Sequence, residues 1–414
     1  MLEKMKSAWR IPELRKKIIY TFGMLLLYRL LCCIPVPGVN IAAVSDAVKN
    51  FSVLDFMNMM TGGSFQNMTI MAMGITPYIN ASIILQLLTV AIPKLEKLAK
   101  EGPEGRKKIT EWTRYLTVAL AFIQAVGLVF AMRANSYGGI WYLVIGVSMA
   151  AGTSLAMWIG ERITENGIGN GISLLIMAGI VSNMFNWSRQ AVVGLVEGTV
   201  GIIAVLVVVL AFLVMIVAIT YVDMGERRIP VQYAKRMVGR KMYGGQSTHI
   251  PMKLNSTGVM PLIFGFAILQ FPATVFAFFP TSGINLWWQG FQSGVWYQVV
   301  LAVLIIAFTY FYTGITFNPA DISKNMQQNG GIIPGIRQGR ATTDYLARVS
   351  SRLTLFSALF LAVLATIPTI ITRLFGVSTP FAASSVLIAV SVGIETIRQI
   401  EAQMVMRHHK GFLG

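Results

Sequence analysis

Long apolar stretches divide this chain, and its basic residues gather in every second gap between them. Only Arg29, Lys49, Arg133, Arg189 and Arg373 of the 34 Lys and Arg residues lie outside six segments. These segments are residues 1–17, 93–114, 161–170, 223–255, 317–352 and 398–414. Because Lys and Arg near membrane spans are retained on the cytoplasmic side, all six segments are expected to face the cytosol. Both termini then lie on that side, which requires an even number of crossings.

Ten apolar runs have the length of a membrane-spanning helix, which needs about 20 residues. The first five cover residues 18–34, 75–92, 115–132, 140–159 and 171–187, and the second five cover residues 200–222, 259–279, 299–316, 353–371 and 381–397. Ten is an even number, in agreement with the charge distribution. The sequence therefore predicts an all-α polytopic membrane protein with ten transmembrane helices.

The two sets of five runs predict two halves of the fold. Residues 18–187 form the first half and residues 200–397 the second, with an external hinge loop at residues 188–199. Outside these, residues 1–17 and 398–414 are expected as cytosolic ends, and residues 223–255 and 317–352 as cytosolic loops. Prolines interrupt the second run at Pro77 and the seventh at Pro261 and Pro272. Matching breaks favour two pseudo-symmetric halves with a pathway between them, although chance also produces such matches.

The composition argues against a soluble globular protein. Hydrophobic residues make up 55% of the chain and charged residues 12%, and the mean hydropathy is +0.64. A formal net charge of +17 is compatible with nucleic-acid binding, but the basic residues alternate with lipid-length runs instead of forming one soluble domain. Acidic lipid headgroups or a docked partner explain the charge better.

Residues 51–74 are apolar but do not suit a membrane crossing. Gly62 and Gly63 break the stretch, and Asp55, Asn58 and Gln66 punctuate it with polar groups. Irregular backbone at membrane depth is tolerated only inside protein or beside a water-filled cavity. The pattern leaves two alternatives, a re-entrant segment that folds back into the helix bundle and an external loop with an interfacial helix.

The sequence contains no recognisable catalytic or metal-binding set. Its three histidines, His249, His408 and His409, lack a metal-binding spacing, and neither a nucleophile elbow nor a Walker loop occurs. The motif GIGNGIS at residues 167–173 lacks the lysine and the preceding strand of a phosphate site. It predicts a tight turn between the fourth and fifth spans. Neither enzyme activity nor a cofactor is expected.

Two kinds of polar residue lie within the predicted spans. Arg29 has no evident carboxylate partner, so a structural role is favoured over an ion relay, either reaching the interface or capping carbonyls. Thr76, Asn80 and Gln86 are polar positions along the second span. In lipid such groups need partners on a facing helix, so they indicate either a contact that can open or ordinary helix association.

Seven motifs occur in a specific order: IPVPG at Ile34, PYINASII at Pro77, GIGNGIS at Gly167, QSTHIP at Gln246, LQFPAT at Leu269, FNPADIS at Phe317 and GIRQGRAT at Gly335. Together they closely resemble the bacterial SecY family, from the first span to the final KGF. Two departures are visible. Gln338 stands where the family usually has proline, which predicts a looser loop turn, and AASS at residues 382–385 replaces the usual GGTS.

The resemblance implies a protein-conducting channel in which two five-span halves surround an hourglass pore. It implies a constriction of aliphatic side chains at Ile75, Ile79, Ile172, Ile176, Ile263 and Ile388. It implies a plug helix in the re-entrant stretch, with Phe56, Met60, Gly62, Gly63, Phe65 and Met68, the glycines giving hinge freedom. It implies a lateral gate between the second and seventh spans, with Thr76, Asn80, Gln86, Gln270 and Phe271. Without the resemblance, ordinary helix packing is preferred for each isoleucine.

The resemblance also implies partners and a location. The basic loops would bind the ribosome or the SecA motor ATPase through Arg227, Arg228, Lys235, Arg236, Arg240, Lys241, Arg337 and Arg340. Signal sequences and unfolded polypeptides would be the substrates, SecE and SecG the companion subunits, and membrane lipids the surroundings, in the bacterial plasma membrane. Two other classes remain as alternatives: a small-solute transporter, which needs a compact polar site, and an intramembrane hydrolase, which needs a nucleophile and a base.

Overall fold

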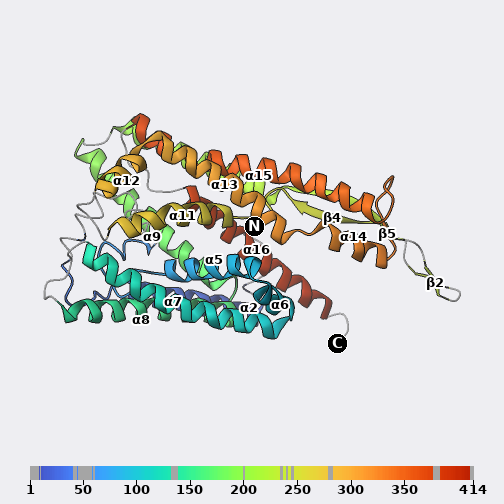
Figure 1. The fold of residues 1–414 in the computed structure, drawn as a ribbon, viewed down its shortest axis with the longest axis horizontal. Helices are drawn as coiled ribbons and strands as arrows, with labels where there is room; N and C mark the ends of the chain where they lie inside the picture. Colours follow the sequence, from blue (N-terminus) through green and yellow to red (C-terminus); the bar gives the residue numbers. More distant parts are fainter. Residues whose placement is uncertain are drawn as a thin grey trace.

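The protein is built mainly of long helices that run roughly along one axis of the molecule (Figure 1). The structure is a computed structural model, and it describes residues 9, 11–40, 44, 58, 61–131, 139–198, 201–233, 236–238, 241–243, 247–277, 283–375 and 383–410.

The helices follow the predicted apolar runs. The first half contains α2 (Pro12–Leu31), α5 (Thr76–Ala91), α6 (Pro93–Lys100), α7 (Pro103–Ala131), α8 (Ile140–Asn166) and α9 (Gly171–Val196). The second half contains α10 (Ile202–Met224), α11 (Met260–Ala277), α12 (Gly283–Ser293), α13 (Val295–Thr316), α14 (Pro319–Gln328), α15 (Arg340–Phe375) and α16 (Ala383–Lys410). Each of the ten predicted runs overlaps one of α2, α5, α7, α8, α9, α10, α11, α13, α15 and α16.

Many of these helices have the length and apolarity of membrane spans. Within the described ranges, six stretches pass on their own, and α5 with α6 adds a seventh if that pair, bent by 107°, is one span. Exposed apolar side chains cover the long helices, as on α10 with Leu206, Leu210 and Val217. Such a surface suits lipid and not water, so the chain is a multi-pass membrane protein.

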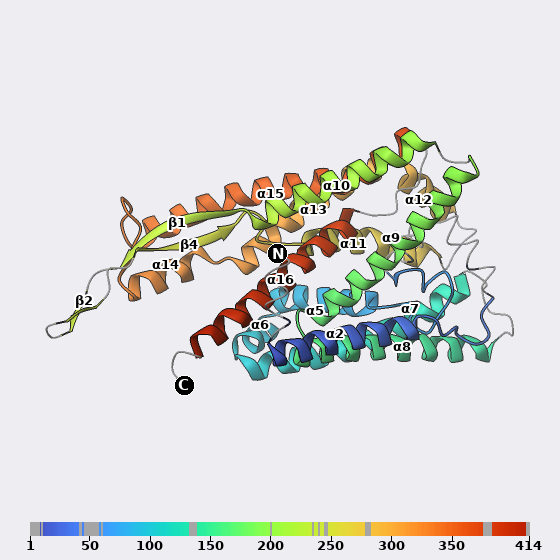
Figure 2. The same ribbon diagram turned by 180° about the vertical axis from the view of Figure 1, so that it is seen from behind.

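The helices form two layers with a further group of helices between them (Figures 1 and 2). One layer holds α2, α5, α7 and α8, and the other holds α10, α13 and α15, while α9, α11 and α16 run between the layers. Within the layers α7 packs on α8 and α13 packs on α15, and α9 packs on α16 across the two halves of the sequence. The halves therefore meet along the inner helices.

A small antiparallel sheet projects beyond one end of the bundle (Figure 2). Its central strand β1 (Glu226–Tyr233) pairs with β4 (Ser247–Lys253) on one edge and β5 (Gly331–Ile332) on the other. Strands β2 (Arg236–Val238) and β3 (Lys241–Tyr243) form a separate hairpin. The sequence analysis placed no strands here, although Ile229 and Val231 are buried and alternate with exposed residues, which is the strand period.

Two boundaries differ from the prediction. Helix α9 continues to Val196, so most of residues 188–199, predicted as a hinge loop, is helical. Helix α16 continues to Lys410, so most of the predicted tail at residues 398–414 is helical too. The apolar pattern indicates which part of a helix lies in lipid, whereas the helix itself ends only where the backbone leaves the helical conformation. After α9 this change of conformation comes at Gly198, which has a φ of +73°.

Two of the three prolines do not interrupt their helices, contrary to the prediction. Pro77 and Pro261 lie in the first turns of α5 and α11, where the missing N–H group would have no helical partner in any case. Only Pro272 lies inside α11. The prolines at equivalent places thus mark the starts of two spans.

Candidate functional site

The six isoleucines singled out by the sequence analysis belong to one hydrophobic cluster. They come from four helices: Ile75 and Ile79 from the start of α5, Ile172 and Ile176 from α9, Ile263 from α11 and Ile388 from α16. Three are buried (Ile75, Ile176, Ile388) and three are half-buried. The cluster therefore lies where helices of both halves meet, and the structure brings all six residues together.

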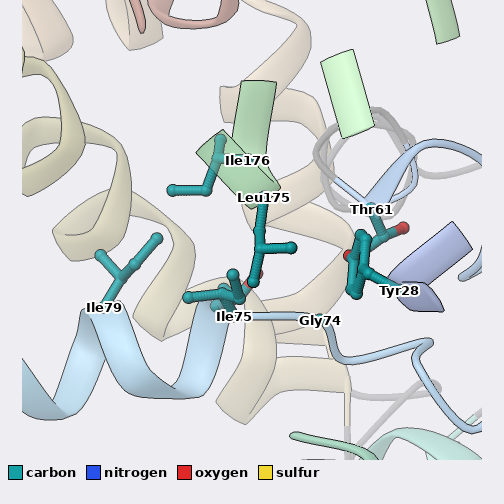
Figure 3. A pocket seen from close by; sticks show the side chains of 8 residues that line it. Tyr28, Thr61, Gly74, Ile75, Ile79, Leu175 and Ile176 are labelled. Atoms are coloured by element: carbon teal, nitrogen blue, oxygen red, sulfur yellow. The ribbon is translucent and has the colours of Figure 1, made fainter. Parts of the chain in front are cut away.

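A small cavity lies at this cluster (Figure 3). Leu175 and Ile176 of α9 lie on one side of it and Ile75 and Ile79 of α5 on another, while Tyr28 and Thr61 lie together away from these four. Gly74 and Thr76 complete the lining. Its volume is about 10 Å³, room for about one water molecule. A space this small and this apolar is closed to a polypeptide.

The lining suits an apolar closure and not the binding of a polar ligand. Its side chains are mainly aliphatic, with hydroxyl groups only on Tyr28, Thr61 and Thr76. In the part of the chain that the structure describes, no three His, Cys, Asp or Glu side chains gather as metal ligands.

The GIGNGIS turn sets the position of the α9 isoleucines. Asn170 is the N-cap of α9, and its side-chain oxygen accepts from the backbone N–H groups of Ile172 at 3.1 Å and Ser173 at 3.3 Å. This confirms the predicted tight turn between α8 and α9.

The same turn is also bonded to two distant helices, which sequence reasoning missed. The Thr21 hydroxyl of α2 accepts from the Ile168 N–H at 3.1 Å, and the Gln399 side chain of α16 accepts from the Gly169 N–H at 2.9 Å. The turn therefore ties the start of α9 to both halves of the molecule.

The described part of the 51–74 segment, residues 61–74 with Asn58, folds back into the bundle. Phe65 and Met68 are fully buried and pack with Ala125 of α7 and Met149 of α8. The segment is also joined to the chain that follows α2, because the Ile70 N–H donates to the Ile34 carbonyl at 2.9 Å. This burial favours the re-entrant alternative over an external loop. Phe56 and Met60 lie outside the described residues.

The polar positions of the second span remain on α5. Thr76, Asn80 and Gln86 are half-buried, and Thr76 also lines the cavity. Gln270 and Phe271 lie in α11, where the structure describes their backbone but not their side chains.

Arg29 lies in the last turn of α2 and points to α9. Its Nη2 donates to the Ala178 carbonyl, and its guanidinium carbon lies 5.9 Å from the centre of the Tyr28 ring. Of the two structural roles predicted for Arg29, the structure confirms carbonyl capping.

The basic loop residues divide into three groups. Arg227, Arg228, Arg337 and Arg340 are exposed, and Arg228 forms a 2.7 Å ion pair with Glu226. Arg236 and Lys241 lie on the backbone of β2 and β3. Lys235 and Arg240 lie outside the described residues. The sequence predicted that Gln338 loosens the turn before α15. The structure shows instead that the Gln338 side-chain amide donates to the Gly331 carbonyl at 3.1 Å, which ties the turn to β5. A proline there could not form this bond.

A buried polar network in the second half was not anticipated. The Oδ1 atom of Asn255 accepts from the Ser357 hydroxyl of α15 and the Gly258 N–H, both at 3.0 Å. Its Nδ2 donates to Asp223 at the end of α10 at 3.2 Å, and the Ser391 hydroxyl of α16 donates to the same carboxylate. An asparagine just before a span was the only sequence signal. The network fixes the start of α11, which carries Ile263.

The sequence matches known proteins over its whole length. A family model for SecY matches residues 69–397. The protein translocase subunit SecY of Streptomyces scabiei is 42% identical over 439 residues, with 100% of both chains covered. That of Aquifex aeolicus is 42% identical over 427 residues, also with 100% of both covered.

Solved structures agree in fold. A protein-conducting channel superposes with a TM-score of 0.68 at 20% identity, covering 94% of this chain and 92% of that one. Sec61 from the canine ribosome-channel complex of the endoplasmic reticulum gives a TM-score of 0.65 at 19% identity over the same shares. With a family match across most of the chain and full-length relatives above two-fifths identity, the chain belongs to the SecY family of protein translocase subunits.

Proposed function

We propose that this chain is a protein-conducting channel whose constriction is the aliphatic cluster of Ile75, Ile79, Ile172, Ile176, Ile263 and Ile388. The observation that carries the proposal is that isoleucines far apart in sequence, on four helices, pack together where the two halves meet. Family membership and the shared channel fold support translocation as the activity. The substrates are unfolded secretory polypeptides, and apolar segments leave sideways into the bilayer.

An aliphatic constriction suits this task physically. A narrow apolar ring excludes water and ions when closed, and it has no fixed hydrogen-bonding preference that would select one polypeptide sequence over another. An apolar segment that reaches lipid gains about 0.3 to 0.6 kcal/mol for each central Leu or Ile. Hydrophobicity itself then decides which segments leave sideways.

The neighbouring segments take the roles of plug and gate in this proposal. The 51–74 segment is the plug, supported by the burial of Phe65 and Met68 and by Thr61, which lines the same cavity as Ile75. The lateral gate lies between α5 and α11, with Thr76, Asn80, Gln86, Gln270 and Phe271. The half-buried polar groups on α5 support a contact that can open.

The topology and partners complete the proposal. The chain crosses the bacterial plasma membrane ten times with both termini in the cytosol, supported by the basic segments and by relatives from Streptomyces and Aquifex. It catalyses no reaction, so the driving force comes from the ribosome or from a SecA motor, and SecE and SecG are its companion subunits.

A secretory chain stalled in transit is expected to crosslink to photoreactive groups at both Ile79 and Ile176. These side chains come from different helices and line one cavity, so a polypeptide passing between them touches both. Adducts are separated by gel electrophoresis and identified by mass spectrometry.

The control is a photoreactive group at Ile84, which lies on the same helix α5 but is 38% exposed and does not line the cavity. It should give lipid adducts and little polypeptide adduct. No adduct at Ile79 and Ile176, or an equally strong one at Ile84, would contradict the proposed path. A small-solute transporter would give none.

Charge reversal by Arg337→Glu is expected to weaken docking of the ribosome or motor about tenfold and to lower the salt dependence of binding by about one unit of slope. Arg337 is exposed and follows β5, and Sec61, of the same fold, was solved in a ribosome-channel complex. Flotation of ribosomes with proteoliposomes at several salt concentrations measures the affinity.

Lys97→Glu is the matched control, because Lys97 is an exposed cation on α6 in the first half. It makes the same change in net charge at a distance from the loops. Equal loss in both variants would show a general charge effect and would remove Arg337 from the docking surface.

A further inference from the structure

The contact between Arg29 and Gly62 joins three elements beside the cavity. Arg29 at the end of α2 donates to the Ala178 carbonyl of α9. A Cβ atom built on Gly62 would lie 2.7 Å from Nη2 and 2.8 Å from Nη1 of that guanidinium, and 2.8 Å from the Gly179 carbonyl oxygen. The proposed plug therefore touches α2 and α9 at one point, against a cation already bonded to α9.

The fit at this point requires glycine for two reasons. Gly62 has a φ of +67°, which other residues adopt only with strain, and a side chain would overlap both the guanidinium and the α9 backbone. Gly63 has a similar φ of +87°, but a Cβ there would be 3.9 Å from its nearest neighbour, a side-chain nitrogen of Asn186. The two glycines thus differ in space and not in backbone conformation.

The contact adjoins the cavity through its sequence neighbours. Tyr28, next to Arg29, and Thr61, next to Gly62, both line the cavity that Ile75 and Ile176 also line. A shift of Gly62 away from Arg29 therefore also displaces its neighbour Thr61, which lines the cavity. Within the described ranges no carboxylate forms an ion pair with Arg29, so its charge is satisfied by a carbonyl dipole and the Tyr28 ring.

We infer that Arg29 is a positioning residue that forms, with Gly179, the seat in which Gly62 holds the plug in the closed channel. The inference rests on the proposed function. The planar guanidinium can donate along its edge to α9 while its atoms pack against the Gly62 backbone, an arrangement that the single ammonium of lysine does not reproduce. Losing the seat frees the plug and opens the closed state to ions.

The test measures the resting ion leak of the full-length chain in proteoliposomes, without substrate. Arg29→Met keeps the side-chain length but removes the donors, and it should raise the leak about tenfold, as expected for one charge-assisted hydrogen bond. Arg29→Lys should give a smaller increase. Gly62→Ala should raise the leak similarly, while Gly63→Ala, which adds only the backbone strain that both positions share, should raise it clearly less.

A double-mutant cycle separates the seat from general damage to the fold. If Arg29→Met and Gly62→Ala act through the same contact, the leak of the double variant falls well below the product of the single effects. The inference would be overturned by a double-variant leak equal to the product of the two single effects. A wild-type leak in Arg29→Met, or an equal leak in Gly63→Ala and Gly62→Ala, would also overturn it. If a stalled chain still crosslinks to Ile79 and Ile176, such a result rejects the role of Arg29 and leaves the proposed channel function intact. The absence of those crosslinks in the wild-type protein would instead reject the proposed channel function.

Discussion

Replacing Ile388 with asparagine is expected to lower the ratio of closed to open channels about 10- to 100-fold. Ile388 is 4% exposed and packs in the cluster with Ile75 and Ile176. An amide buried there without a partner costs about 1–3 kcal/mol, and each 1.4 kcal/mol is about a factor of ten. In the open channel the amide meets water or a passing chain, so the penalty falls on the closed state. Ile263→Asn should act in the same direction but less strongly, because Ile263 is half-buried.

Export of a reporter with a defective signal sequence measures this effect, because a channel that opens too readily accepts poor signals. Ile388→Val, which shortens the side chain without adding a polar atom, should keep wild-type stringency. Leu387→Asn tests general damage, since Leu387 is buried in a different cluster within the second half. It should lower the amount of folded protein instead of the stringency. Normal stringency in well-folded Ile388→Asn would contradict the assigned constriction.

Asn255→Ala is expected to destabilise the second half by about 2–4 kcal/mol. The buried Asn255 side chain bonds to Asp223, Ser357 and the Gly258 N–H, so its loss leaves the buried Ser357 hydroxyl and the half-buried Gly258 N–H without this acceptor, while Asp223 keeps Ser391. An unsatisfied partner in a low-dielectric interior loses more than a hydrogen bond is worth on average. Thermal unfolding of the detergent-solubilised chain, followed by circular dichroism, should show a lower midpoint.

Ser256→Ala is the matched control, because Ser256 is exposed and lies next to Asn255 in the same connection. Its midpoint should equal that of the wild type. Equal midpoints for Asn255→Ala and Ser256→Ala would mean that the network does not contribute to stability.

The positions of the long helices could be predicted because apolar length is a local property of the sequence. Their ends could not, since α9 and α16 continue past the apolar runs as far as the backbone permits. Strand β1 was missed for a different reason. Its alternation of Ile229 and Val231 is short, and its buried face forms by packing on Met326 of α14 and Leu346 of α15, which are distant in sequence.

The site shows the same division between local and distant information. The convergence of six isoleucines was expected from the family resemblance, because periodicity alone favours ordinary packing for each of them. Carbonyl capping was one of two structural roles expected for Arg29, and the identity of its partner as Ala178, on another helix, is a result of tertiary packing. Gln338 was expected to loosen its turn, and only the position of the Gly331 carbonyl shows the opposite.

The three-stranded sheet has a mechanical consequence. Strand β1 lies between α10 and α11 in the chain, and β5 lies between α14 and α15. The pairing of Gln232 with Ile332 therefore joins two connections that are distant in sequence and that also share one hydrophobic cluster. A displacement of either connection is therefore passed on to the helices that follow it in the chain, α11 and α15. Since α11 follows β4 in the chain and carries Ile263, a movement of this sheet reaches the isoleucine cluster through a short connection.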